Sequence, residues 1–199
     1  MGTVFDDPVS LFVFYGAIAV ALGPDILREI RHRRSDTETA KTRDEGSKRV
    51  IGVAVGSGFL AGVAAVYVFP AMSILGDVRV LFVGGIAVLF LGTGLRQYAV
   101  RTLDDYFTSS IKIHQSQQVV DTGPYRWVRH PSYTGGLVQY TGIALVLNNW
   151  ISLIVIVSLL FIAYFYRMRI EERVLSKELG EPYLDYLERT PHRLIPYVW

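Results

Sequence analysis

The sequence predicts an all-α integral membrane protein with about five transmembrane helices. Of its 199 residues, 51% are hydrophobic and only 19% are charged, and the mean hydropathy is +0.31. A soluble domain of this length normally carries more charge. The charged residues are also nearly absent from several long windows and crowded between them. This alternation is typical of a chain whose helices cross an apolar bilayer core and whose loops reach water.

Four of the five expected helices come from the longest uncharged windows. Residues 50–69 contain no charge, and at about 1.5 Å per residue these twenty residues cross a hydrocarbon core of about 30 Å. Residues 80–95 form a second uncharged run. The uncharged stretch 131–166 is too long for one helix, so we expect a helical hairpin that turns at Asn148-Asn149. Its two helices would be residues 131–147 and 150–166.

The first apolar run, residues 8–22, is short for a membrane span, and we expect it to end at Gly23-Pro24-Asp25. Residues 19–21 also resemble the small-residue cleavage site of a secretory signal peptide. However, the run is preceded by Asp6 and Asp7 and by no Lys or Arg, which is unlike a signal peptide. We therefore expect a membrane anchor with its N-terminus outside.

The basic residues predict how the helices are oriented. Nineteen of the twenty Lys and Arg residues lie in three segments, 28–49, 96–129 and 167–193, and only Arg79 lies in the remaining connections. Cytoplasmic loops carry the excess of Lys and Arg. We therefore expect a multi-pass protein with its N-terminus outside and with its C-terminus and any site near these segments in the cytoplasm.

Composition also excludes several kinds of chemistry. The absence of cysteine rules out disulfides, a thiolate zinc site and a cysteine nucleophile. The four histidines have no metal-binding spacing, so no metal is expected. A net charge of +2 makes a nucleic acid an improbable partner. Membrane lipids are the expected surroundings.

We expect a single integrated domain with two parts: residues 1–115 with the N-terminal helices and a cytoplasmic loop, and residues 116–199 with the polar motifs and the hairpin. Residues 31–48 mix basic and acidic side chains and predict a solvated, mobile loop that touches anionic headgroups.

In the second helix, glycines recur at four-residue spacing, which favours close packing of a neighbouring helix over a phosphate-binding loop. These are Gly52, Gly56, Gly58 and Gly62.

The first candidate site precedes the fourth helix. Gly123-Pro124 marks a turn, and Pro131 is suited to the first turn of a helix. Arg129, His130, Ser132 and Tyr133 would then surround that helix's N-terminus. A helix start offers free N–H groups and a positive dipole to a carboxylate. Alternatively, the aromatic and basic residues only anchor the helix at the lipid headgroups.

The second candidate site follows the fifth helix. Arg167 and Glu171 are four residues apart and share one helix face, as do Arg169 and Arg173. Charges at this level are costly unless they are paired or used. The alternative is a solvated stripe of ion pairs beyond the membrane. Because no serine-centred nucleophile motif occurs, the remaining chemistry is one that needs only binding and orientation.

These motifs resemble the isoprenylcysteine carboxyl methyltransferases, their prokaryotic relatives and, more distantly, phospholipid methyltransferases. The resemblance runs from Gln117 to Pro196. It rests on Gly-Pro-Tyr at 123–125, Arg-His-Pro-Ser-Tyr with Gly at 129–135, and Arg167 with Glu171-Glu172. Further matches are Leu-Gly-Glu-Pro-Tyr at 179–183, Tyr186, and Arg-Thr-Pro at 189–191.

The resemblance implies a membrane methyltransferase that binds S-adenosylmethionine without a Rossmann domain, releases S-adenosylhomocysteine, and has a cytosol-facing pocket closed by C-terminal helices. Arg167 would orient the substrate carboxylate, Glu171 would bind a ribose hydroxyl or the cationic end of the cofactor, and the tyrosines would face adenine or the sulfonium. The cofactor-binding set would be Gln117, Gln118, Val119, Val120, Tyr125, Arg129, His130, Pro131, Ser132, Tyr133 and Glu171.

The function that this resemblance implies is carboxyl O-methylation of an isoprenylcysteine-like lipophilic acid that enters from the membrane. The cationic Arg167 favours an acid. Three alternatives stay open: N-methylation of a phospholipid or other lipid amine, a sterol-reductase-like oxidoreductase, and a non-catalytic membrane scaffold.

Overall fold

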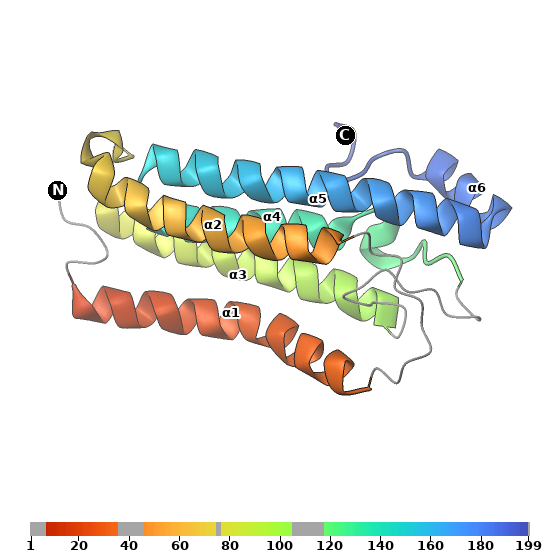
Figure 1. Ribbon diagram of the computed structural model, residues 1–199, viewed down its shortest axis with the longest axis horizontal. Helices are drawn as coiled ribbons and strands as arrows, with labels where there is room; N and C mark the ends of the chain where they lie inside the picture. Colours follow the sequence, from red (N-terminus) through yellow and green to blue (C-terminus); the bar gives the residue numbers. More distant parts are fainter. Residues whose placement is uncertain (1–6, 36–45, 75–76, 105–117, 199) are drawn as a thin grey trace.

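The structure is a bundle of long helices, as the composition predicted. The computed structural model describes residues 7–35, 46–74, 77–104 and 118–198, and in this part of the chain helices account for nearly all regular structure. The helices α1 to α5 extend along the long axis of the molecule, and the short α6 lies beside the end of α5 (Figure 1). The elements are α1 (Pro8–Ser35), α2 (Ser47–Val68), η2 (Pro70–Met72), α3 (Val78–Leu103), η4 (Gly123–Arg126), α4 (Pro131–Val146), α5 (Trp150–Leu179) and α6 (Glu181–Arg189).

The membrane-protein prediction is confirmed. Four helices, α1, α2, α3 and α5, are long and apolar enough to cross a bilayer, and many large apolar side chains on them are exposed. The 16 residues of α4 rise only about 24 Å, which is less than a typical hydrocarbon core of about 30 Å. Five spans therefore stay a prediction, as does the division at residues 115 and 116.

The expected end of the first helix at Gly23-Pro24-Asp25 was wrong, because α1 continues through Pro24 to Ser35. The ribbon bends in this part of the helix (Figure 1). A proline inside a helix removes one backbone hydrogen bond and weakens the ladder beside it. Gln139 of α4 donates from Nε2 to the carbonyl of Ala21, 3.2 Å away, so a neighbouring helix satisfies a backbone group next to the bend.

The hairpin at the two asparagines is confirmed. α4 ends at Val146 and α5 begins at Trp150, and the Asn149 side chain caps α5 by accepting from the backbone N–H groups of Ile151 and Ser152. The amide nitrogen of Asn149 also donates to the carbonyl of Phe69, at 2.9 Å. The turn is thereby fixed to the end of α2.

Glycines set the closest helix contact, but mainly not those that the sequence singled out. A Cβ atom on Gly92 of α3 would overlap the backbone of Gln139, and one on Gly142 of α4 would overlap the backbone of Leu89. The backbones of α3 and α4 therefore touch. In α2, Gly58 and Gly62 do pack against α5, whereas Gly52 and Gly56 face open space. The predicted packing role is wrong for these last two within this chain.

The predicted loop at residues 31–48 is shorter than expected. α1 extends to Ser35 and α2 begins at Ser47, so both ends of the segment are helical. Lys48 pairs with Glu29 of α1, which joins the two helices where they approach each other. Residues 36–45 lie outside the described part of the chain, so mobility and headgroup contact there stay predictions.

Candidate active site

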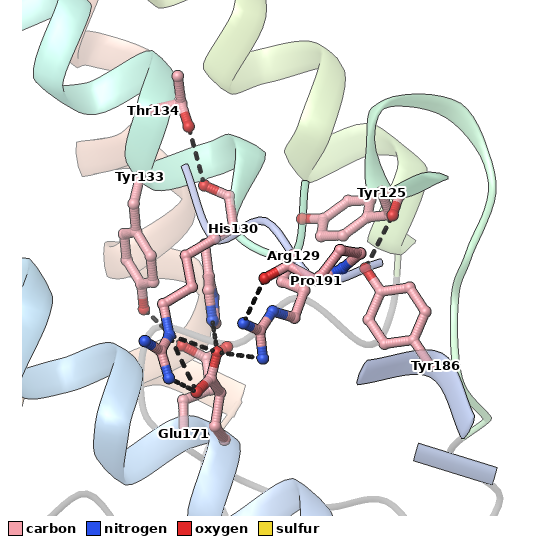
Figure 2. Close-up of polar contacts among 10 residues, drawn as sticks. Tyr125, Arg129, His130, Tyr133, Thr134, Glu171, Tyr186 and Pro191 are labelled. Atoms are coloured by element: carbon pink, nitrogen blue, oxygen red, sulfur yellow. Dashed lines mark hydrogen bonds and ion pairs between the residues drawn. The ribbon is translucent and has the colours of Figure 1, made fainter. Parts of the chain in front are cut away.

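The two candidate sites of the sequence form one site, because the start of α4 lies against the C-terminal half of α5. Tyr133 of α4 points toward Glu171 of α5, and His130 and Arg129 point toward the neighbouring position on α5 (Figure 2). His130 is the N-cap residue and Pro131 occupies the first turn of α4, as predicted.

A single tyrosine hydroxyl connects the two charged residues that the sequence placed on one face of α5. Arg167 donates from Nε to the Tyr133 hydroxyl at 2.8 Å, and that hydroxyl donates to Oε2 of Glu171 at 2.7 Å. Arg167 also donates to the Ser47 hydroxyl at the start of α2. Arg167 is only 5% exposed. The alternative of a solvated ion-pair stripe is therefore wrong for this residue.

The next residue, Glu172, has quite different surroundings. Arg193 donates to both of its oxygens, at 2.8 Å from Nη2 to Oε2 and 3.1 Å from Nε to Oε1. His130 Nε2 and Arg129 Nη1 each lie 3.1 Å from Oε1. Since an ionised carboxylate only accepts, His130 Nε2 is the donor in this contact. Glu172 thus contacts three basic side chains, and its hydrogen bonds with Arg193 raise the pKa of that guanidinium.

The C-terminal segment 190–194 crosses the start of α4. The backbone N–H groups of Arg129 and His130 donate to the carbonyls of His192 and Arg193, both at 2.9 Å. The Thr134 hydroxyl donates to the carbonyl of Leu194 at 2.7 Å. The bond from His130, the N-cap residue, occupies a donor that a helix start otherwise leaves free. The segment therefore fixes α4 to the rest of the site.

The tyrosines beside this site are buried and stay protonated at neutral pH. Tyr125 of η4 is held from behind by the Tyr186 hydroxyl, which donates to its backbone carbonyl at 2.8 Å (Figure 2). Burial, and then the negative charge of Glu171, raise the pKa of the Tyr125 and Tyr183 hydroxyls above their usual range. Of these tyrosines and Tyr133, it is Tyr133 that contacts Glu171 directly, through its hydroxyl at 2.7 Å.

Two buried polar atoms in the site have no hydrogen-bond partner among the described residues. The Tyr125 hydroxyl and the Arg129 Nε make no hydrogen bond of good geometry within the described residues, although Ser132 lies near the hydroxyl. Unsatisfied buried donors are costly and rare in proteins. Both belong to the predicted cofactor-binding set, so a bound molecule with acceptor groups would fit them.

The structure brings together most, but not all, of the predicted residues. Tyr125, Arg129, His130, Pro131, Ser132, Tyr133, Arg167 and Glu171 lie in the site and are buried or partly buried. Gln118 is exposed, and Val119 and Val120 are partly buried on the approach to η4. Gln117 lies outside the described residues.

The anchor at the lipid headgroups, the other interpretation of this segment, is wrong for the buried Tyr125 and Tyr133. Trp127, in contrast, is 49% exposed with the Arg126 guanidinium 4.8 Å from its ring centre, as an interfacial residue would be.

Sequence reasoning missed the roles of Glu172, Arg193 and the crossing segment. The doublet at 171–172 was noted, but periodicity alone cannot show that its two members face different partners. One available signal was the pair Pro191 and Pro196, since prolines this close prevent a helix and leave extended backbone with free carbonyls.

The fold and site thus define a helical membrane protein whose polar site is built from α4, α5 and the C-terminal segment. Residues 80–182 match the family model described as phospholipid methyltransferase. The chain belongs to this family.

Its relatives include protein-S-isoprenylcysteine O-methyltransferases. The chain is 34% identical over 116 residues to form B from Arabidopsis thaliana, which covers 57% of this chain and 58% of that protein. It is 34% identical to the enzyme from Rattus norvegicus over 59% of this chain and 42% of that one. It is 30% identical to the one from Saccharomyces cerevisiae over 60% and 52%. The matched region thus spans about half of these curated relatives.

The fold is similar to that of a solved structure, the eukaryotic intramembrane Ras methyltransferase ICMT (isoprenylcysteine carboxyl methyltransferase). The TM-score is 0.62 at 23% identity, and the match covers 96% of this chain and 64% of that chain. The similarity therefore extends beyond the family-matched region to the N-terminal helices.

Proposed function

We propose that this protein is an S-adenosylmethionine-dependent membrane methyltransferase that methylates the carboxylate of an isoprenylcysteine-like lipophilic acid. The observation that carries the proposal is the Tyr133 hydroxyl, which joins Arg167 on one side and Glu171 on the other. Arg167, a cation suited to an anionic methyl acceptor, is thereby joined through two hydrogen bonds to Glu171, an anion suited to a cationic methyl donor. The names of the relatives support the same activity.

The residues present fit the cofactor. The Tyr125 hydroxyl and Arg129 Nε, which have no hydrogen-bond partner among the described residues, would take its acceptor groups. Glu171 would take a hydroxyl or the cationic end, and the rings of Tyr125 and Tyr133 would face its flat or cationic parts. Arg129 and His130 also face Glu172, so their charge toward a cofactor carboxylate would be reduced. When bound, S-adenosylmethionine would supply an electrophilic methyl group.

The chain's own residues need only to bind and orient the acceptor. A carboxylate is already anionic, so no general base is required, and orientation supplies most of the rate. The Arg167 guanidinium would hold the carboxylate through its planar donors while the prenyl tail lies among the exposed apolar side chains of the bundle. Because Tyr125 and Tyr183 stay protonated, neither hydroxyl would compete with the acceptor for the methyl group.

We place this site on the cytoplasmic side and the N-terminus outside. The support is the distribution of basic residues in the sequence: nineteen of twenty fall in the segments 28–49, 96–129 and 167–193, which hold the site residues Arg129 and Arg167. A reactivity assay of single cysteines, introduced into this cysteine-free chain at Asp7 and at Arg189, tests the orientation. Modification of the Arg189 position from outside intact cells would contradict it.

The experiment that tests the activity uses the full chain in lipid nanodiscs with S-adenosylmethionine labelled in its methyl group. We expect label in an S-prenylcysteine with a free carboxylate and none in the same compound with the carboxylate converted to an amide. Absence of transfer together with absence of S-adenosylhomocysteine binding by calorimetry would overturn the proposal.

A second candidate is N-methylation of a lipid amine, which the family description favours. In that case Glu171, rather than Arg167, would face the acceptor. The same assay with phosphatidylethanolamine as the acceptor separates the two candidates, because an amine acceptor would be labelled even in an Arg167→Ala variant.

A further inference from the structure

A partly buried polar cluster between α1 and α3 connects α1 to the first turn of α4. Asp25, one residue after the proline of α1, accepts from Arg96 Nε at 2.6 Å and from Gln97 Nε2 at 3.0 Å, both on α3. Arg28 of α1 donates to Asp25 and to Gln97, at 3.1 and 2.8 Å. Asp25 and Arg28 both lie in a candidate membrane span. Paired charges there are costly and usually serve a function.

Arg96 extends from this cluster to the candidate active site. Its Nη1 donates to the backbone carbonyl of Ser132 in the first turn of α4, at 3.1 Å. The backbones of Arg96 and Gly135, one turn further along α4, also touch: a Cβ atom on Gly135 would lie 2.5 Å from the Arg96 backbone nitrogen. Side chain and backbone of one residue therefore hold the turn that carries Ser132 and Tyr133.

The ion pair with Asp25 explains how a cation can be placed here. The N-terminus of a helix is the positive end of its dipole, so an unpaired arginine beside α4 would be unfavourable. The Asp25 carboxylate offsets that charge and fixes the guanidinium, which otherwise samples many rotamers. α1 lies outside the family-matched residues 80–182, so this contact is a contribution of the N-terminal part.

We propose that Asp25 and Arg96 are positioning residues: the Asp25–Arg96 pair fixes the first turn of α4 and thereby sets the affinity of the site for its cofactor. This inference rests on the proposed function for its readout with cofactor. It does not require Asp25 or Arg96 to touch any bound molecule.

The test is a double variant, Asp25→Asn with Arg96→Gln, which removes both charges of the pair together. The asparagine keeps a side-chain oxygen that can accept from Arg28. We expect its melting temperature to stay near that of the parent, its dissociation constant for S-adenosylhomocysteine to rise about tenfold, and amide hydrogen exchange in residues 132–136 to accelerate. Asp77→Asn is the matched control, since Asp77 caps the far end of α3 and asparagine caps equally well.

A purely structural cluster would lower the melting temperature without changing the affinity of the folded protein. Parent-like affinity and parent-like exchange in the folded double variant would overturn the inference. If the double variant does not fold, Arg96→Lys is used instead: a point charge cannot reach both Asp25 and the Ser132 carbonyl, so unchanged exchange there would overturn it equally. A parent that binds no S-adenosylhomocysteine would refute the proposed function, and hydrogen exchange alone would then decide this inference.

Discussion

Two adjacent glutamates on α5, Glu171 and Glu172, have opposite surroundings. Glu172 is contacted by three basic side chains from the start of α4 and the C-terminal segment, and 9% of the residue is exposed. Glu171, within the described part of the chain, accepts one hydrogen bond, from Tyr133, and is more exposed. One carboxylate is saturated by protein donors, whereas the other has lone pairs left for a ligand.

This difference separates a carboxylate that stabilises the site, Glu172, from one that can bind a ligand, Glu171. A carboxylate saturated by arginines cannot exchange them for a ligand without leaving buried cations unpaired. A carboxylate with one tyrosine donor can accept further donors at little cost. Because consecutive helix residues point about 100° apart, neighbouring positions reach different elements. We therefore assign Glu172 to the architecture of the site and Glu171 to its chemistry.

The largest effects are expected from the residues assigned to binding, Glu171 and Arg167. Glu171→Ala should abolish S-adenosylhomocysteine binding, because it removes the carboxylate that has lone pairs left for a ligand beside Tyr133. Arg167→Ala should keep that binding and lower turnover by roughly a thousandfold, since only the acceptor loses its cation. Arg167→Lys should be a poor substitute, because a point charge cannot replace the planar donors. Calorimetry and the methyl-transfer assay measure the two quantities, and equal loss of cofactor binding in both alanine variants would contradict the division.

The next largest effect is expected from Glu172, the residue assigned to the architecture of the site. Glu172→Gln removes the charge that three basic side chains share, so we expect the free energy of unfolding to fall by about 2–4 kcal/mol. The measurement is thermal unfolding in nanodiscs. The matched control is Glu171→Gln at the adjacent position, for which we expect little change in stability. A Glu172→Gln protein as stable as the parent would remove the distinction between the two residues.

Much of this arrangement was predictable, and the limits have physical reasons. Apolar run length predicted α2, α3 and the hairpin at Asn148-Asn149, because bilayer thickness constrains helix length directly. Pro24 misled the prediction, because a bent helix can continue where neighbouring helices satisfy its backbone. Arg167 and Glu171 were found from spacing and resemblance. The partners of Glu172 were not, because they lie forty-two residues upstream, at His130, and twenty-one residues downstream, at Arg193.

The smallest effect is expected from the loss of the Tyr133 hydroxyl, which joins Arg167 to Glu171. Tyr133→Phe keeps the ring, which lies 4.7 Å from that of Tyr164, and removes the hydrogen bonds to Arg167 and Glu171. Each hydrogen bond to a charged group contributes about 1.5 kcal/mol net, so from the loss of both we expect turnover to fall about a hundredfold while the protein stays folded.

Tyr164→Phe is the matched control for this prediction, because its hydroxyl bonds neither Arg167 nor Glu171 in the described structure, although its ring belongs to the same cluster. If Tyr133 only fills space, the two phenylalanine variants will behave alike. If its hydroxyl sets the distance between Arg167 and Glu171, only Tyr133→Phe will lose turnover. The loss will then be in kcat more than in the dissociation constant for S-adenosylhomocysteine, because Glu171 itself remains in place.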